Sequence, residues 1–553
     1  MRLRPGRLFK AADLQLKTRA ARFAGEAAPT RVIRLAGGAA VTLGGALAIR
    51  EMLTPVQAEE SDPCRGAQTK PAASVHETRV YSVDDIRQMV ANGRIVVALR
   101  AELFDVTDFT GHPGGVGRLQ LAAGGDLEVF WKTYTQHNRG HIDKVMRPYR
   151  IGTVSDASMR AITTATHFDA SAYQNDPPPS EHLLTNTRHP YNAEGRLSEV
   201  GADFITPIGR HFVRNHASVP DLHPNEYLLT VSGEGLVETT FTLEELKTRF
   251  EAVEVTTVIQ CNGNRREDYH LLDGETPAFG PPHWVAGAIA NATWSGPRLR
   301  DVLQAAGMDV DGIALGKQAA PVRAEQVGLV GYDHDEVGNQ YCCSFPFDKA
   351  IDPMGDVILA THMNGQPIPR QHGYPVRAII PGHAGARNCK FLESVTVTDT
   401  PCECHKNWKQ YAVHAPDVPI RKLCEFEKHK AELTIDAAVQ EMPVQSLITS
   451  PSAGDVLSAL KRGDDAIEVR GVAWGGGGQG VNRVDVSLDD GANFTRAEML
   501  EKPIHERRKS QWSWVLFRKR VPLPEVCSHA HATQPTRSPC GKSRPSHSSR
   551  PRF

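Results

Sequence analysis

Three blocks of the chain differ in how hydrophobic and polar residues alternate. In the first block, VYSVDDIRQMV predicts a capped helix and IVVALRAELFDVTDF predicts two strands joined by a turn. In the second, strand-like runs such as EVTTVIQ mix with helical stretches such as LEELKTRFE. In the third, IEVRGVAWGGGGQGVNRVDVSLDDGANF alternates apolar and polar residues between Gly- and Asp-rich turns, as strands of a β-sandwich do. We therefore expect an α+β multidomain protein whose third domain is all-β.

Composition marks where these domains begin and end. A polar stretch ending in Pro177-Pro178-Pro179 predicts a linker, flexible first and stiffer at the prolines. The last residues are rich in Ser, Pro, Arg and His and have no apolar periodicity, so we expect an aberrant tail that cannot close the sandwich. The predicted parts are a presequence at 1–75, domains at 76–154, 182–425 and 440–525, a linker at 155–181, and the tail at 526–553.

The N-terminal segment has the composition of a mitochondrial transit peptide. Up to Arg34 it carries many Arg and Lys residues, and its acids are Asp13 and Glu26. The apolar run LAGGAAVTLGGALAI follows at 35–49, and its fifteen residues fall short of the ~20 that a membrane span needs. We expect a two-part presequence that directs the protein to the intermembrane space. A short membrane anchor is the alternative.

The overall charge and the cysteines exclude some classes of protein. The net charge of −1 gives no reason to expect a nucleic acid partner. Ten scattered cysteines in 553 residues do not form a disulfide framework. Cys402 and Cys404 lie two apart, and we expect them not to be zinc ligands. Cys342 and Cys343 we expect to be small buried residues, with a role as soft metal ligands as the alternative.

Two histidines in the first domain could hold a heme. FDVTDFTGHPGG places His112 in a turn, and WKTYTQHNRGH offers His137 twenty-five residues later. The apolar run LQLAAGGDLEVFW lies between them. Imidazoles on both faces of an iron porphyrin leave no open coordination site, so such a centre transfers electrons. Two ordinary surface histidines are the alternative.

The stretch VIQCNGNRRED places Cys261 in a turn beside two arginines. Nearby guanidinium groups favour the thiolate, which is either a nucleophile or a metal ligand. A cysteine-hydrolase nucleophile needs a partnered histidine and an orienting group, and only generic histidines are present.

Loops rich in Arg, His and Lys flank this stretch on both sides. Such loops make multi-donor sites for anionic groups, with forked hydrogen bonds from Arg and a point charge from Lys. Their cationic residues include Arg214 and His216 in GRHFVRNHASVP, and His372, Arg377, Arg387 and Lys390 in RQHGYPVRAIIPGHAGARNCKFL.

These motifs resemble those of a known family. Residues 81–152 resemble the cytochrome b5 fold, and FDVTDFTGHPGG matches its first heme-ligand motif nearly throughout. FVRNH, CNGNRRED, WVAGAIANATWSGPRLRDVL, MNGQPIPRQHGYPVRAIIPG and GARNCKFL resemble the molybdenum-cofactor domain of the sulfite oxidase family. The third block resembles that family's immunoglobulin-like dimerisation domain.

The resemblance implies roles for individual residues. Cys261 would be a ligand of molybdenum, and His112 and His137 would be the axial ligands of a b-type heme. The substrate pocket would be formed by Arg214, Arg266, Trp284 and Tyr411. The molybdopterin cofactor and its phosphate would be held by Phe212, Arg214, Asn215, His216, Asp333, His372, Arg377, Asn388, Cys389 and Lys390.

The resemblance also implies a reaction and partners. Sulfite would be oxidised to sulfate, and electrons would pass singly through the heme to cytochrome c in the mitochondrial intermembrane space. The third domain would make a homodimer. The family's third pocket arginine does not appear after Pro524, which leaves a catalytically impaired electron-transfer protein as an alternative. A nitrate reductase-type molybdoenzyme is the other alternative, although its heme domain follows the molybdenum domain.

Overall fold

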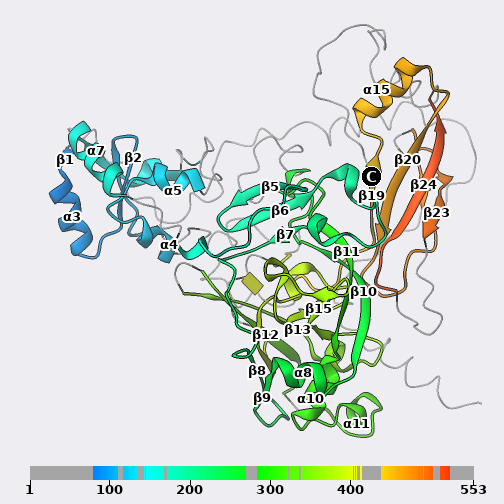
Figure 1. Ribbon diagram of the computed structural model, residues 1–553. Helices are drawn as coiled ribbons and strands as arrows, with labels where there is room; N and C mark the ends of the chain where they lie inside the picture. Colours follow the sequence, from blue (N-terminus) through cyan, green and yellow to red (C-terminus); the bar gives the residue numbers. More distant parts are fainter. Residues whose placement is uncertain are drawn as a thin grey trace, which may run out of the picture. The chain divides into compact units, whose positions relative to one another are not determined.

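A computed structural model describes residues 79–523 (Figure 1), apart from 110–111, 113–115, 134–141, 143–144, 167–170, 269–282, 322, 336–337, 403, 405, 408–410, 414–437, 490 and 502–510. The predicted presequence at 1–75 and tail at 526–553 lie outside the described residues. Within the described part of the chain, no helix has the length and apolar character needed to cross a membrane.

The first domain is a small α+β unit built on a four-stranded sheet of order β1-β4-β3-β2. Its first helix begins where the sequence predicts, because Ser82 and Asp85 form a reciprocal capping box. The elements are β1 (Val80–Tyr81), α3 (Val83–Ala91), β2 (Val96–Leu99), β3 (Glu102–Asp105), α4 (Val116–Leu121), α5 (Leu127–Thr133), η2 (Arg147–Tyr149) and β4 (Arg150–Val154).

A helix occupies the first part of the predicted linker. Helix α7 (Asp156–Ala165) begins at the N-cap Ser155, and its Ile162 is buried in one core with the first domain. The hydroxyl of Thr163 donates a hydrogen bond of 2.7 Å to the Asp126 carboxylate. The segment is mostly polar in composition, but it forms a helix with one apolar face. Because that face packs on the first domain, this domain extends beyond the predicted boundary at 154.

The middle domain is built from several small sheets. The largest has the order β13-β12-β18-β8-β9, and the others have the orders β10-β11-β15-β16, β5-β6-β7 and β14-β17. The strands are β5 (Leu183–Arg188), β6 (Tyr191–Gly195), β7 (Val213–Arg214), β8 (Leu228–Gly233), β9 (Thr239–Thr242), β10 (Ala252–Gln260), β11 (Ile289–Pro297), β12 (Gln326–His334), β13 (Gln340–Pro346), β14 (Ile358–Ala360), β15 (His362–Met363), β16 (Gln366–Pro367), β17 (Arg377–Ile379) and β18 (Leu392–Thr398).

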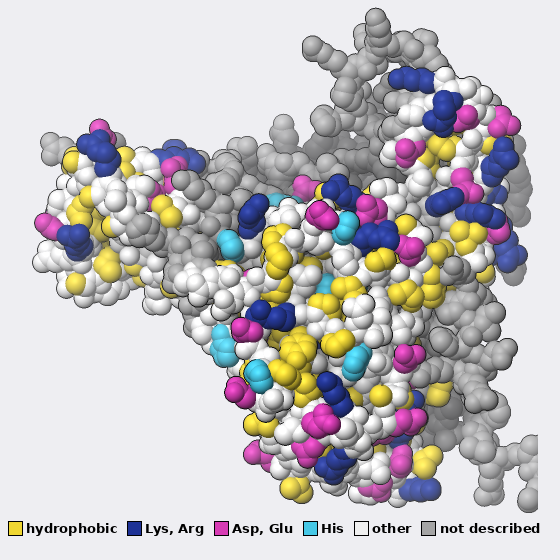
Figure 2. Space-filling model, viewed as in Figure 1, with side chains coloured by type: hydrophobic (Ala, Val, Ile, Leu, Met, Phe, Trp, Pro, Cys, Tyr) yellow, Lys and Arg dark blue, Asp and Glu magenta, His cyan; other side chains and the backbone are white. Residues whose placement is uncertain are grey.

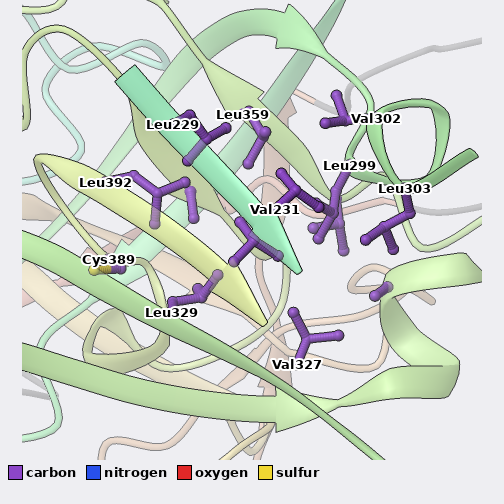
Figure 3. Packing of buried hydrophobic residues seen from close by; sticks show 14 of the residues in the cluster. Leu229, Val231, Leu299, Val302, Leu303, Val327, Leu329, Leu359, Cys389 and Leu392 are labelled. Carbon is purple, nitrogen blue, oxygen red and sulfur yellow. The ribbon is translucent and has the colours of Figure 1, made fainter. Parts of the chain in front are cut away.

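Short helices cover the largest sheet and fill its core. Figure 3 shows Leu229 of β8 and Leu329 of β12 packed with Leu303 of α10 and their neighbours, all fully buried. The helices of this domain are α8 (Leu243–Thr248), α10 (Leu299–Ala305), α11 (Val310–Ala314), α12 (Phe347–Ile351), η3 (Ser171–Tyr173), η4 (Leu197–Glu199), η5 (Ile208–Arg210), η6 (Arg370–His372) and η7 (Gly385–Arg387).

The third domain contains a four-stranded sheet of order β19-β20-β24-β23 and a two-stranded sheet, β21-β22. The segment WSWVLFRKRVPL forms the predicted strand, which lies between β20 and β23. The elements are β19 (Gln445–Ser450), α15 (Ala453–Arg462), β20 (Ala466–Trp474), β21 (Asp485–Val486), β22 (Thr495–Arg496), β23 (Glu498–Glu501) and β24 (Val515–Pro522).

Tryptophans of the third domain are bonded to the middle domain. The indole N–H of Trp474 donates to the side-chain oxygen of Gln260 at 2.9 Å, and that of Trp514 donates to the Phe204 carbonyl at 2.9 Å. Both rings lie in one hydrophobic cluster with Val258 of β10. Because Gln260 lies one residue and Val258 three residues before Cys261, this core also supports the turn that carries the thiol.

We expect Trp514→Ala to destabilise the protein by ~3–5 kcal/mol, the usual cost of removing a buried aromatic side chain. Trp514 is 1% exposed and its hydrogen bond to Phe204 would also be lost. Phe494→Ala is the matched control, since Phe494 is 62% exposed. Urea denaturation followed by tryptophan fluorescence measures both variants, and equal midpoints would contradict the prediction.

The surface carries mixed charge. On the face drawn in Figure 2, Lys and Arg side chains are interspersed with Asp and Glu side chains among the described residues. This distribution agrees with a formal net charge of −1.

Candidate active site

A pocket in the middle domain collects most of the predicted site residues. It contains about 610 Å³ of empty space, part of it open to solvent. Its walls come from five separated parts of the chain, so the fold alone brings these side chains together. The predicted residues that line it are Phe212, Arg214, His216, Cys261, Asp333, His372, Arg377, Asn388, Lys390 and Tyr411.

The thiol of Cys261 is fixed in this wall by backbone hydrogen bonds. Cys261 follows the last residue of β10, and its N–H donates to the Ala288 carbonyl at 2.9 Å. Its carbonyl accepts from the Asn264 N–H at 2.9 Å, which closes the Asn-Gly-Asn turn. The Gly263 N–H donates to the sulfur at 3.4 Å. Cys261, which is 6% exposed, is thereby held in the pocket wall.

The two consecutive arginines after this turn have different surroundings. Arg265 has a positive φ of 65° and pairs with the carboxylate of Asp268 at 2.7 Å. Arg266 is instead mostly buried, and burial lowers the pKa of its guanidinium while the neighbouring Cys261 and Tyr411 partly oppose that shift. The backbone of Arg265 thus separates the two side chains, and Arg266 is the one close to the thiol.

Gly263 leaves room for Arg266 and Trp284. A Cβ at this position would lie 2.7 Å from Nη2 of Arg266 and 2.7 Å from Cδ1 of Trp284, so no larger residue fits without displacement. Trp284 is fully buried, and its indole nitrogen has no hydrogen-bond partner among the described residues. The structure therefore brings both predicted pocket residues next to the Cys261 turn.

The hydroxyl of Tyr411 contacts two other predicted site residues, His216 and Arg214. This hydroxyl is 2.6 Å from Nε2 of His216 and accepts a hydrogen bond of 3.4 Å from Arg214. Burial, followed by the charge of Arg214, holds the pKa of His216 well below its ordinary value. The neutral imidazole can therefore share a proton with the Tyr411 hydroxyl without adding charge to the pocket.

A group of buried cations forms another side of the pocket. The ammonium of Lys390 donates to the Gln371 carbonyl at 3.0 Å and to the side-chain oxygen of Asn215. Burial and the nearby Arg377 lower its pKa to about 7. Burial raises the pKa of the Asp333 carboxyl, although Lys390 opposes that shift. Buried positive charge with one carboxyl nearby favours an anionic ligand.

Arg377 and His372 form a connected pair in the same wall. The guanidinium donates to the His372 carbonyl at 3.0 Å and to the Asn388 carbonyl at 3.3 Å, and it lies 5.1 Å from the ring centre of Trp294. Burial lowers the pKa of Arg377 to about 10, so it stays charged at neutral pH.

His211 is a pocket residue that was absent from the predicted set. Its ring centroid is 4.9 Å from that of His372, and Nε2 of each ring has no hydrogen-bond partner among the described residues. Burial lowers the pKa of His211 to about 3 and that of His372 well below the usual range, so both are neutral. His211 stands in GRHFVRNH, but no sequence signal distinguishes it from an ordinary core histidine.

The side chains of two predicted site residues, Asn388 and Cys389, bond to or pack against other parts of the protein. The Asn388 amide accepts from the Ile380 N–H at 2.8 Å and donates to the His383 and Ala384 carbonyls. The thiol of Cys389 is fully buried in the hydrophobic core beside Leu392 (Figure 3) and does not line the pocket. Cys389 was predicted among the residues that hold the cofactor, and the structure places its side chain in the core.

Arg387, predicted as part of an anion-binding loop, is also occupied by protein acceptors. Its fully buried guanidinium donates to the Val439 carbonyl at 2.7 Å, to the Tyr411 carbonyl at 3.2 Å and to the Asn407 side chain. It holds in place the segment that carries Tyr411.

The first domain holds His112 beside an apolar cluster. The imidazole is half-buried, with its ring centroid 6.2 Å from that of Phe109 in an edge-to-face arrangement. Phe109 in turn packs at 5.3 Å against Tyr149, next to a core that includes Trp131. His137 lies outside the described residues.

Half-buried Lys390 makes the stability of the cofactor-free protein depend on pH. Its pKa is about 7 in the folded protein, against an ordinary value of 10.5. Between these values the unfolded chain binds more protons than the folded chain, so stability rises with pH. We expect the melting temperature to rise from pH 7 to pH 9, and Lys390→Met to remove part of that rise. Exposed Lys461→Met is the control, and an unchanged slope in Lys390→Met would contradict the expectation.

Comparison with known protein families covers most of the chain. Residues 82–155 match the cytochrome b5-like heme/steroid binding domain. Residues 216–406 match the oxidoreductase molybdopterin binding domain, and residues 436–534 match the Mo-co oxidoreductase dimerisation domain. The chain is 35% identical over 477 residues to mitochondrial sulfite oxidase of Macaca fascicularis, covering 85% of this chain and 80% of that protein. The chain belongs to the sulfite oxidase family.

Two further relatives differ in how much of their own length is matched. Sulfite oxidase of Gallus gallus is 37% identical over 435 residues, which is 78% of this chain and 87% of that protein. A nitrate reductase of Hordeum vulgare is 33% identical over 344 residues, which is 61% of this chain but 37% of that protein. The predicted family and α+β multidomain fold class are thus confirmed. The chain is a molybdenum-dependent oxidoreductase with molybdopterin and heme as cofactors.

The residues of the pocket fit a molybdenum–pterin group. Cys261 supplies a soft sulfur donor, which suits molybdenum. The ammonium of Lys390 and the buried guanidinium of Arg377 suit an anionic phosphate. The Nε2 atoms of His211 and His372, which have no partner among the described residues, can bond to polar groups of a pterin.

Proposed function

We propose that this chain oxidises sulfite to sulfate, with Cys261 as the protein ligand of molybdenum. The observation that supports this most directly is the convergence of one buried thiol with Arg214 and Tyr411 in a single pocket, with Arg266 close to the same thiol and to Tyr411. When bound, the molybdenum–pterin group supplies oxygen transfer and accepts two electrons.

The side chains around the thiol would bind and orient the substrate. Sulfite is a small oxyanion, and two guanidinium groups would hold its oxygens with charge-assisted hydrogen bonds and orient it beside Cys261. Neutral His216 would keep the Tyr411 hydroxyl pointed into the pocket, because the two atoms are 2.6 Å apart. Buried Trp284 would exclude water from the Arg266 side.

The remaining predicted residues would hold the cofactor. Lys390 and Arg377 would bind its phosphate, with Asn215 orienting the ammonium of Lys390. Phe212, His216, His372 and Asp333 would contact the pterin. In the first domain, His112 and His137 would be the axial ligands of the heme.

We further propose that electrons leave singly through the heme to cytochrome c in the mitochondrial intermembrane space. The names of the mammalian relatives include "mitochondrial", and the basic N-terminal segment agrees with that location. The match to a dimerisation domain supports a homodimer.

A spectroscopic experiment tests the proposed function. Sulfite added to the oxidised protein, loaded with both cofactors, should convert the heme spectrum to the reduced form, and added cytochrome c should restore it. Nitrate added to the reduced protein should leave the spectrum unchanged. A fully loaded preparation whose heme stays oxidised with sulfite would refute the proposal.

A further inference from the structure

Three cysteine thiols converge outside the pocket. Cys342 lies on β13, and Cys402 and Cys404 lie in the segment that follows β18. Their three sulfur atoms all lie within 4.8 Å of one another, and those of Cys342 and Cys402 are 2.7 Å apart. All three side chains are half-buried, so a small ion from solvent can reach them. None of the three lines the candidate active site.

The backbone around these cysteines is held by specific hydrogen bonds. The Cys402 N–H donates to the hydroxyl of Ser344 at 3.0 Å. The buried Asn407 amide donates to the same hydroxyl at 3.2 Å and to the Cys402 carbonyl at 3.0 Å, and its N–H donates to the Cys404 carbonyl at 2.9 Å. The Cys404 thiol also donates to the Cys342 carbonyl at 2.7 Å, so both backbone groups and a sulfur fix Cys402 and Cys404 next to β13.

Three close thiols have a recognisable chemical preference. Soft thiolate ligands select Cu(I) or Zn(II) over hard cations. With metal–sulfur bonds of ~2.3 Å, three sulfurs around one ion lie ~3.8–4.0 Å apart. That spacing falls within the 4.8 Å observed here, so a small movement of Cys342 or Cys402 completes the site.

We propose that Cys342, Cys402 and Cys404 form a second metal site, which binds one thiophilic d10 ion, Cu(I) or Zn(II). Cu(I) is satisfied by three sulfurs, whereas Zn(II) takes a water as a fourth ligand. The proposal replaces the interpretation of Cys402 and Cys404 as non-ligands, which rested on their spacing alone. That spacing says nothing about Cys342, which is distant in sequence and supplies the third sulfur.

The site would fix a segment that reaches the active site. Asn407 accepts a hydrogen bond from Arg387, and the same guanidinium donates to the Tyr411 carbonyl at 3.2 Å. A metal at the three thiols would therefore restrain one end of the segment whose other end carries Tyr411.

Elemental analysis of the purified protein tests this site. We expect close to one equivalent of zinc or copper per chain in addition to molybdenum and iron, and the element found distinguishes the two ions. The double variant Cys402→Ser/Cys404→Ser should lose it while keeping molybdenum and heme. Cys343→Ala is the matched control, because Cys343 is the neighbouring thiol on β13 but lies in the hydrophobic core.

Two additional measurements decide the remaining outcomes. X-ray absorption at the zinc or copper edge of the wild-type protein should show about three sulfur neighbours at ~2.3 Å, a readout that does not require the variant to fold. Amide hydrogen exchange at Asn407 and Tyr411 should be faster in the double variant than in Cys343→Ala.

The proposal is overturned if reduced protein supplied with Zn(II) or Cu(I) binds neither ion. It is also overturned if the double variant retains the metal, or if mass spectrometry finds a Cys342–Cys402 disulfide without metal. Because no readout involves sulfite, failure here is distinct from failure of the proposed function.

Discussion

Replacing Cys261 with serine should lower the rate of sulfite oxidation by more than ~100-fold. Loss of a residue that only supports a metal ligand already costs up to ~100-fold, and loss of the ligand itself should cost more. The hydroxyl of serine is harder and far less acidic than the thiol, so it cannot replace a soft thiolate donor. The backbone bonds from Cys261 to Ala288 and Asn264 do not involve the sulfur and should keep the turn intact. Stopped-flow reduction of the heme by sulfite measures the effect.

The control for this variant is Cys343→Ala, which removes a buried thiol of the same domain that does not line the pocket. It should keep the wild-type rate, and both variants should keep the oxidised heme spectrum. Wild-type turnover in Cys261→Ser, with its molybdenum content intact, would refute the ligand role.

Replacing Arg266 with glutamine should raise the KM for sulfite by ~10–150-fold. A hydrogen bond to a charged group contributes ~1.5–3 kcal/mol, and each 1.4 kcal/mol corresponds to a factor of ten in affinity. The effect should be large at this position because Arg266 is mostly buried, close to both Cys261 and Tyr411. Steady-state kinetics over a wide range of sulfite concentrations separates KM from kcat.

Arg265→Gln is a closely matched control for this variant. It makes the same chemical change one residue earlier, where the guanidinium pairs with Asp268 and is over a third exposed. Surface ion pairs contribute ~0–1 kcal/mol, and this one lies away from the thiol, so the KM should stay within about twofold. Equal effects of the two variants would show that overall charge, rather than the placement of Arg266, determines sulfite binding.

The sequence predicts the family, the fold class and most members of the pocket because the motifs are local and dense. Cys261 and its turn, the Arg214 loop and the Lys390 loop each stand in a short recognisable stretch. The order of residues in a loop does not by itself determine the direction of each side chain. The left-handed backbone of Arg265 separates two adjacent arginines, and the backbone after Arg387 directs the Cys389 thiol into the core.

Other differences arise from contacts between distant segments. His211 is recognisable as a pocket residue only through its position against His372, which is 161 positions away in sequence. Helix α7 was concealed because its polar composition resembles that of a linker, although Ile162 packs into the first domain. The cysteine cluster likewise depends on β13 lying beside the segment after β18.

Arg387 affects how far the length of the segment between Tyr411 and Val439 could vary among related proteins. Its guanidinium holds the carbonyls of Tyr411 and Val439, and the Val439 N–H donates to the Tyr411 carbonyl at 2.9 Å. Arg387 therefore holds together the two described ends of the chain on either side of residues 414–437. The entropy of closing a loop changes by only ~0.6 kcal/mol when its length doubles. Insertions and deletions there can accumulate over evolution at little cost to the pocket, provided that Arg387 keeps the two ends together.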